Sequence, residues 1–395
     1  MNSFADKNLI DDVFLRTFGG KPTRYFSAPG RTEMGGNHTD HQRGRVLAAA
    51  VNLQTLAAVR PNDLGEIRVL SQGYPMCRIP TGMWACQPEE QGTTAALIRG
   101  MGAGFAQLGC PVGGFDAYVT STVLPGSGLS SSAAFEVLIG TIINALFYGS
   151  QATPAQIAAM GQWAENVYFG KPCGLMDQMA SAVGGLVTID FADAAAPAVR
   201  QVKFDFSTCG YALCIIDTGA DHADLTPEYG AIPAEMGAIA NYFGKNVLSE
   251  VPEEDFYGAI IALRQSCGDR AVLRAIHYYN ENRRVDAQVR ALEQGDFEEF
   301  LEQVRQSGRS SYMFLQNVIV PGRPGQEMAL TLALCERLLA GRGACRVHGG
   351  GFAGTVQAFV PEERLDGFRA EIERVLGPGS CHILQIRPFG GVELK

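Results

Sequence analysis

Hydrophobic and polar positions along the 395-residue chain follow two different periods. Residues 115–123 alternate between apolar and polar side chains, which predicts a strand. Residues 133–147 form an apolar run long enough for a buried helix, and Pro154 lies where the first turn of a second helix would begin. Expected helices and strands are mixed in blocks, which indicates an α+β chain.

The remaining segments extend this prediction over most of the chain. Further strands are expected from residue 24, at 46–59, 187–191 and 211–217, and around a glycine loop at 345–360. Further helices are expected at 11–18, 95–108 and 328–339, over most of 232–310, and from 153 to about 167. An Ala/Asp-rich turn at 192–199 predicts a boundary near residue 200, and therefore two domains, 1–200 and 201–395.

Composition supports a folded chain with a sizeable core. Hydrophobic residues make up 46% and charged residues 18%, which excludes intrinsic disorder because disorder needs low hydrophobicity and high charge. The 47 glycines follow no period of three, so a collagen-like structure is excluded as well. The length fits two domains better than one.

Charge and cysteine usage restrict the partners and the compartment. The net charge of −9 comes without basic blocks and argues against nucleic acid or an anionic membrane as the main partner. No apolar stretch approaches the length of a spanning helix, and the first 18 residues do not resemble a secretory signal. The ten cysteines form no C-x-x-C pair, which favours free thiols in a reducing cytoplasm.

Residues 29–41 bring a cation and two hydrogen-bonding side chains together among glycines. Arg31 comes first, and His38 and Asp40 follow after the glycines. Carboxylates and imidazoles bind hydroxyl groups in fixed directions, so the segment suits a polyhydroxylated ligand. A structural loop in which His38 and Asp40 act as local caps explains the pattern equally well.

Residues 124–134 are a second candidate segment, in which glycines precede serines at the start of a helix. Such a loop exposes unpaired backbone N–H groups that favour phosphate, although an ordinary serine cap is the alternative. No Gly-Lys-Ser/Thr follows, so this is not a Walker A loop.

Residues 349–354 fit G-x-G-x-x-G, but a strand pattern follows them, which argues against dinucleotide binding. Glu165 and Asp177 form a further candidate set, with a helix-capping role as the alternative for Asp177.

Four segments in this order resemble the galactokinases of the GHMP small-molecule kinase superfamily, across essentially the whole chain. The family opening Gly-Arg-x-Asn-x-x-Gly-Glu-His-x-Asp is similar to residues 30–40, and the phosphate loop to Gly-Ser-Gly-Leu-Ser-Ser-Ser-Ala at 126–133. The Pro-Cys-Gly-Ile-Met-Asp-Gln segment is similar to 172–178, and the third glycine loop to 349–354. The resemblance implies a two-domain α+β fold, with a ribosomal protein S5 domain 2-like N-terminal domain and a ferredoxin-like C-terminal domain.

The resemblance also implies the roles of individual residues. Asp177 looks like the base that takes the proton of the anomeric hydroxyl, and Arg31 looks like its cationic partner. Ser132 and Glu165 match the positions that hold Mg²⁺, and ATP is the implied phosphoryl donor. The positions matching sugar contacts are Asn37, His38, Asp40, Gly174 and Tyr229. The positions matching the phosphate cradle are Gly126, Ser127, Gly128, Ser130, Ser131 and Ser132, and those of the third glycine loop are Gly349, Gly350 and Gly351.

Departures from the family pattern gather where the sugar is expected. The family Glu, which resembles a contact to the C6 hydroxyl, is Asn37, and the family Asn is Glu33. The family Tyr after Asp40 is His41, and the Thr before the third loop is His348. The expectation is a galactose 1-kinase that is a monomer or weak dimer. The alternatives are a 1-kinase of galacturonate or another modified hexose and, from another class, a non-catalytic sugar/ATP sensor.

Overall fold

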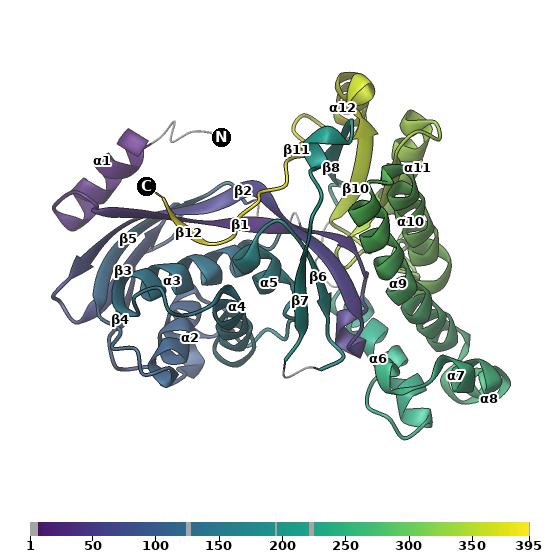
Figure 1. Cartoon of the computed structure of the whole chain (residues 1–395), viewed down its shortest axis with the longest axis horizontal. Coiled ribbons are helices and arrows are strands. Elements are labelled where there is room, and N and C mark those ends of the chain that lie inside the picture. The colour runs from purple at the N-terminus through teal and green to yellow at the C-terminus, as the bar shows by residue number, and fades with distance from the viewer. Residues whose placement is uncertain (1–6, 124–127, 194–195, 221–224, 395) are drawn as a thin grey trace.

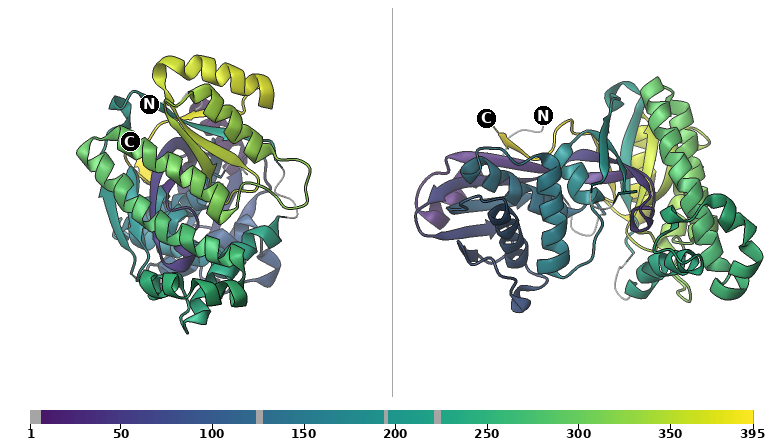
Figure 2. Two further views of the ribbon diagram at one scale, coloured as in Figure 1. Left: turned by 90° about the vertical axis from the view of Figure 1, so that its right-hand side faces the viewer. Right: turned by 60° about the horizontal axis from the view of Figure 1, so that its bottom comes forward.

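The computed structural model describes residues 7–123, 128–193, 196–220 and 225–394. Its strands form two sheets, and helices cover both (Figure 1). The right-hand view of Figure 2 shows the two halves side by side, the purple and blue N-terminal sheet in one and most of the green and yellow elements in the other. The architecture confirms the predicted α+β class.

Eight strands make up the first sheet in the described part of the chain. Their order is β12-β1-β2-β5-β3-β4, while β6 pairs with β2 and β7 pairs with β6. β3 runs parallel to β5, and the other pairings are antiparallel. The bounds are β1 Arg24–Gly35, β2 Arg45–Asn62, β3 Glu66–Ser71, β4 Cys77–Pro80, β5 Gly114–Ser121, β6 Leu186–Asp190, β7 Ala198–Val202 and β12 Val392–Leu394.

Side chains alternate between the two faces of this sheet, as the strand period requires. Ala57 and Val59 of β2 belong to the core under α2 to α5, whereas Ala58 between them packs with Phe14 and Phe18 of α1 on the opposite face. The bounds are α1 Lys7–Phe18, α2 Thr94–Gln107, α3 Ser131–Phe147, α4 Pro154–Trp163 and α5 Met176–Val183.

The second sheet is antiparallel, in the order β11-β8-β10-β9. On one face Cys214 and Val356 pack with α11 and α12, and on the other Ile215 and Phe359 pack with α10. The bounds are β8 Tyr211–Asp217, β9 Ala344–His348, β10 Thr355–Pro361, β11 Cys381–Leu384, α6 Thr226–Tyr242, α7 Glu253–Gly258, α8 Ile260–Cys267, α9 Asp269–Gln294, α10 Phe297–Ser310, α11 Glu327–Leu339 and α12 Leu365–Leu376.

One apolar core joins the two halves. Met34 and Leu47 at the ends of β1 and β2 belong to the same buried cluster as Phe300 of α10 and Phe359 of β10. The chain also returns to its starting sheet, because Val392 of β12 lies opposite Ser27 of β1. The division into 1–200 and 201–395 remains a prediction, and β12 shows that the C-terminal end contributes a strand to the first sheet.

The structure corrects three boundaries expected from the sequence. The sequence predicts a glycine-rich loop at residues 30–36, but residues 30–35 are the end of β1, where bulges interrupt its register with β2. Residues 45–62 form one long strand rather than several. The helix expected from 153 ends at Trp163 and continues as a π-helical turn, Ala164–Phe169. The short strands β3, β4 and β7 carry patterns too brief to be recognised in advance.

Two expectations about compartment can be compared with the structure. All ten cysteines are free thiols, five of them buried, while Cys86 is exposed. Among the described residues, no helix combines the length and the apolar character that crossing a membrane requires.

Candidate active site

Arg31 and Asp177 meet at the centre of the candidate site. Arg31 lies in the irregular end of β1 and Asp177 in the first turn of α5. Arg31 Nε donates to Asp177 Oδ1 at 2.7 Å, and Nη2 lies 2.6 Å from the same oxygen. Arg31 Nη1 also donates to the carbonyl of Gly128. The Asp177 side chain is 29% exposed against 9% for Arg31, so the carboxylate remains accessible to a substrate.

Ser130 departs from the usual behaviour of a helix cap. It precedes α3 with φ +59°, a left-handed conformation that non-glycine residues rarely adopt, and its side chain makes no cap hydrogen bond. Instead its hydroxyl donates to Asp177 Oδ2 at 2.6 Å. The first N–H groups of α3 therefore lack a side-chain cap at Ser130, which leaves the helix N-terminus suited to an anion.

Glu165, which is buried, and Ser132, which is half-buried, form a pair beside this helix start. Ser132 Oγ donates to Glu165 Oε1 at 3.1 Å, and Lys171 Nζ lies 3.4 Å from the same oxygen. Glu165 is 2% exposed and lies on the π-helical turn. Such turns are frequent at functional sites. The structure thus brings together the two residues expected to bind a metal ion.

Gly128, in the described part of the loop expected to bind phosphate, packs against the strand that precedes the third glycine loop. A Cβ on Gly128 would lie 3.1 Å from His348 Nδ1 and 3.2 Å from Thr355 Oγ1, so a side chain there has almost no room. His348 Nδ1 pairs with Thr355 Oγ1, and Nε2 pairs with Thr32 Oγ1. Burial, together with the charges of Arg31 and Arg346, lowers the pKa of His348 well below its usual value. His348 is therefore a neutral spacer behind the loop.

Asp40, Gly174 and His38 are three of the positions expected to contact the sugar. A Cβ on Gly174 would lie 2.2 Å from Asp40 Oδ2, so glycine is required for this close approach. His38 Nε2 donates to the carbonyl of Gly350 at 3.0 Å. Burial and the neighbouring His41 lower the pKa of His38 to about 4, which makes its imidazole neutral at neutral pH.

Asn37 is 1% exposed, and its side chain hydrogen-bonds within the protein. Its Nδ2 donates to Glu33 Oε1 at 3.1 Å and to the carbonyl of Gly349 at 2.7 Å, and its Oδ1 accepts from Asn317 Nδ2 at 3.0 Å. Glu33 in turn pairs with the buried guanidinium of Arg346. Asn37 and Glu33, the two positions where Asn and Glu are exchanged relative to the family pattern, are thus in direct contact. The Glu33 carboxylate points to Arg346.

Tyr229 connects α6 with the third glycine loop. Its hydroxyl donates to the carbonyl of Gly351 at 2.9 Å, and its ring meets Phe352 edge-on. A Cβ on Gly350 would lie 2.7 Å from Tyr229 Cε1, which explains the glycine there. Burial raises the pKa of Tyr229 to about 12.

The described candidate residues form two groups that share the end of β1. Arg31, Asp177 and the start of α3 form one group, named the transfer side for its expected role, and residues 37–40 with the third loop form the other, named the sugar side for its expected role. Ser131 begins α3 next to Ser132. Gly126 and Ser127 lie outside the described residues.

Two family models match the chain in the regions just described. The galactokinase galactose-binding signature matches residues 12–61, and the GHMP kinases N terminal domain matches residues 95–185. The first range contains Arg31 and Asp40, and the second contains Ser132, Glu165 and Asp177.

A full-length relative decides the family. The galactokinase of Streptomyces coelicolor is 31% identical over 366 residues, which cover 92% of this chain and 91% of the relative. The chain belongs to the galactokinase family. It is accordingly a sugar kinase, a phosphotransferase acting on an alcohol group, with ATP as its implied co-substrate.

Solved structures agree with this galactokinase-family fold. The Lactococcus lactis galactokinase complexed with galactose superimposes with a TM-score of 0.82 at 23% identity, over 98% of this chain and all of that one. The Methanococcus jannaschii mevalonate kinase gives a TM-score of 0.66 at 14% identity, over 93% of this chain and 99% of that one. The fold is therefore that of the wider GHMP kinases.

Sequence reasoning missed a polar stripe on α9 that holds residues 36 and 37. His277, Glu281, Arg284 and Gln288 recur at helical spacing on α9, and all are buried. His277 Nε2 donates to the Asn37 carbonyl at 2.9 Å, and Glu281 Oε1 accepts the Gly36 N–H at 3.3 Å. Their spacing of four, three and four residues was the available signal.

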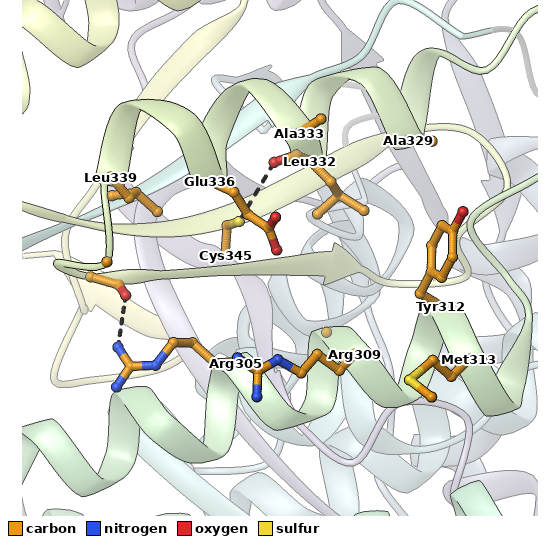
Figure 3. A pocket seen from close by; sticks show the side chains of 13 residues that line it. Arg305, Arg309, Tyr312, Met313, Ala329, Leu332, Ala333, Glu336, Leu339 and Cys345 are labelled. Atoms are coloured by element: carbon orange, nitrogen blue, oxygen red, sulfur yellow. Dashed lines mark hydrogen bonds between the residues drawn. The ribbon is translucent and has the colours of Figure 1, made fainter.

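A separate cavity of about 600 Å³ lies between α10 and α11 (Figure 3). Tyr312, Met313, Leu332 and Cys345 are among its lining residues, and none of the described candidate site residues lines it. Cys345 reaches it from β9, while the adjacent Arg346 reaches Glu33. The strand thus separates this cavity from the candidate active site.

Proposed function

We propose that this chain transfers the γ-phosphoryl group of ATP to the anomeric hydroxyl of galactose, with Asp177 as the base and Arg31 as its cationic partner. The observation that carries the proposal is the contact of the Asp177 carboxylate with Arg31 on one oxygen and Ser130 on the other. The family, its galactose-binding signature and the named relatives support the substrate.

The contacts of Asp177 fix the direction of its carboxylate. Two guanidinium nitrogens hold Oδ1, and the Ser130 hydroxyl donates to Oδ2. The anomeric hydroxyl transfers its proton to this carboxylate as its oxygen attacks the γ-phosphorus. The bond from that phosphorus to the bridging oxygen of ADP then breaks. A positioned base contributes about 10²–10⁴ in rate.

Positive charge on the transfer side comes mainly from the backbone and Arg31. The phosphates of ATP would lie at the N-terminus of α3, where the N–H groups lack a cap from Ser130. Arg31 lies close enough to the phosphate loop to donate to Gly128, so its guanidinium also stabilises charge on the transferring group.

Ser132 and Glu165 fit a magnesium ion. A buried carboxylate next to a hydroxyl supplies the hard oxygen ligands that Mg²⁺ prefers, and the Lys171 ammonium beside it is 63% exposed and can move away. When bound, Mg²⁺ would neutralise charge on the β- and γ-phosphates. Glu165 and Ser132 would hold it there.

The sugar is proposed to bind between residues 37–40, Gly174 and the third glycine loop. Asp40 is held against Gly174, and His38 against Gly350, so both polar side chains have fixed directions. Fixed acceptors and donors are what recognition of sugar hydroxyl groups requires. Tyr229 supports the same loop from α6.

The test is a coupled ADP-release assay with MgATP and a panel of sugars: galactose, galacturonate, arabinose and N-acetylgalactosamine. We expect galactose to be turned over. A panel in which galactose is inert while another sugar reacts would overturn the galactose assignment.

The role of Asp177 is tested by Asp177→Asn, which keeps the shape and removes the base. We expect kcat to fall at least 10²-fold while calorimetry shows galactose binding largely intact. Unchanged turnover would rule out the base role, and the exposed Asp12→Asn on α1 serves as the matched control.

A second candidate substrate is galacturonate, favoured by the exchanged Asn37 and Glu33. A carboxylate at position 37 would repel a uronic acid by about 1–4 kcal/mol at a separation of ~4 Å, whereas an amide does not. The Glu33 carboxylate is paired with Arg346 instead. Galacturonate turnover above that of galactose in the same panel would favour this assignment.

A further inference from the structure

Gln178 lies between two buried carboxyl groups beneath the candidate metal site. Its Nε2 donates to Glu165 Oε2 at 2.9 Å and to Glu136 Oε2 at 3.0 Å. Gln178 and Glu136 are fully buried, and Glu165 is nearly so. Both N–H bonds of the amide are therefore used, one by each carboxyl group, which restricts its rotation.

The first turn of α5 connects this amide with the proposed base. Asp177 and Gln178 are consecutive, and their side chains contact different partners. Asp177 reaches Arg31 and Ser130, while Gln178 reaches Glu165. One helical turn thus sets the position of the proposed base and of the carboxylate expected to bind the metal.

α3 supplies the other two corners of the cluster. Ser132 and Glu136 are four residues apart on the same face of the helix. Ser132 contacts Glu165 Oε1, and Glu136 contacts Gln178, so three hydrogen bonds and the backbone of α3 close a ring. A Cβ on Gly161 would lie 3.0 Å from Glu136 Oε2 and 3.1 Å from Gln178 Cγ, so α4 closes the ring tightly on that side.

Stability alone does not explain this cluster. Glu136 Oε1 and Gln178 Oε1 are buried and have no hydrogen-bond partner among the described residues. Unpaired buried acceptors destabilise a fold, and an apolar side chain of the same size would avoid that cost. The arrangement does fix Glu165 Oε2 while Oε1 faces Ser132 and the exposed Lys171.

We propose that Gln178 is a positioning residue, anchored by Glu136, that orients Glu165 so that Oε1 faces the metal ion. The proposal deepens the function above and rests on Glu165 as a metal ligand. Residues that orient metal ligands from behind typically change metal affinity 10–100-fold when they are replaced.

The test is Gln178→Met, which keeps the volume and removes both N–H groups. Binding of Mn²⁺ in the presence of ADP, measured by electron paramagnetic resonance, should weaken about 10–100-fold. Galactose affinity by calorimetry should stay unchanged, and KM for MgATP should rise while KM for the sugar does not. Wild-type Mn²⁺ affinity in a folded Gln178→Met protein would overturn the proposal.

Variants at Glu136 test the anchor. Glu136→Gln keeps an acceptor oxygen for Gln178 and should bind Mn²⁺ almost as the wild type does, whereas Glu136→Leu removes the acceptor and should weaken binding. Equal losses in the two variants would mean that the charge of Glu136 acts directly, and would overturn its role as an anchor.

Two further variants separate this proposal from the function on which it rests. Gln162→Met removes a nearby amide that donates to the Cys173 carbonyl at 3.2 Å, and it should leave Mn²⁺ binding unchanged. If Gln162→Met lost as much Mn²⁺ affinity as Gln178→Met, the effect of Gln178 would be one of general packing, and the proposal would be overturned.

Wild-type Mn²⁺ affinity in Glu165→Gln would overturn the metal role of Glu165 itself. Loss in Glu165→Gln with wild-type affinity in Gln178→Met would overturn only the positioning role.

Discussion

The transfer side and the sugar side of this kinase are built by different means. On the transfer side, backbone groups and short motifs meet: the start of α3, the turn at Ser130, and the contact of Arg31 with Asp177. On the sugar side, a buried network of charged side chains from both halves of the chain holds residues 33–37. The first depends on backbone geometry and on contacts within the first 200 residues, and the second on the docking of α9, α10 and β9.

The difference explains where the chain departs from its family pattern. Arg31, Asp177 and Ser132 are proposed to serve chemistry that is the same for every sugar, so we expect their replacement to affect phosphoryl transfer itself. The sugar loop tolerates exchange of Glu33 and Asn37 because the two side chains touch and Arg346 can pair with the carboxylate. Specificity can change there while the reaction is preserved.

The largest expected effect on the transfer side is that of Arg31→Lys. An ammonium cannot present two donors to Asp177 Oδ1 and a third to Gly128 in the geometry of a guanidinium. We expect kcat to fall about 10²–10³-fold with little change in the KM for the sugar, measured by ADP release. The exposed Arg78→Lys is the control. A rise in sugar KM at unchanged kcat would place Arg31 on the sugar side instead.

Gly174→Ala is the corresponding test of the sugar side. The new Cβ would meet Asp40 Oδ2 at 2.2 Å, and the short Asp40 side chain must move to make room. We expect KM for the sugar to rise about 10–100-fold while the affinity for ADP, measured by calorimetry, is unchanged. Gly230→Ala, next to Tyr229 and with open space around the new methyl group, is the matched control. Equal losses of sugar and nucleotide affinity would contradict the division into two sides.

The sequence predicted the transfer side well because its parts are continuous in the chain. The helix at 133–147 was visible as a pattern of neighbouring residues, whereas Arg31 was expected in a glycine-rich loop and lies in the end of β1. The pairing of Arg31 with Asp177 joins residues 146 positions apart, and only the family resemblance placed them together. The π-helical turn around Glu165 has no distinct sequence pattern, so its boundary was missed.

The sugar side was harder to predict because its contacts span the two halves. Glu33 and Arg346 are 313 positions apart, and nothing in either local sequence specifies the partner. The sequence identified Asn37 as a sugar contact by resemblance, and the fold buries its side chain between Glu33 and Asn317. Its direct contact with sugar therefore stays a prediction.

Restoring the family arrangement tests whether the exchanged pair sets specificity. Glu33→Asn alone removes one carboxylate partner of Arg346, and the Glu281 carboxylate, 3.8 Å from the guanidinium, remains. We expect the free energy of unfolding to fall by about 1–3 kcal/mol. The double variant with Asn37→Glu should recover part of that loss and raise the ratio of kcat/KM for galactose over galacturonate about tenfold. Additive destabilisation and an unchanged ratio would show that the two positions act independently.

The smallest expected effect concerns His348, which lies between the two sides and near Arg31 and Arg346. Burial and these cations lower the pKa of His348 in the folded protein. As the pH falls below 6.5, the ordinary pKa of histidine, His348 therefore binds a proton in the unfolded chain but not in the folded one. Stability is therefore lost towards acid pH. A histidine that stays neutral when folded costs about 1 kcal/mol between pH 6.5 and 5.5.

A matched variant isolates this contribution from other groups. Burial lowers the pKa of His277 and raises the pKa of Glu33, so the two groups change stability with pH in opposite senses. His348→Gln keeps a donor and an acceptor but does not titrate. Denaturant unfolding at pH 6.5 and 5.5 should show a smaller loss of stability in the variant than in the wild type. An identical loss in both proteins would mean that His348 is protonated in the folded state, and would place an extra positive charge directly behind the phosphate loop.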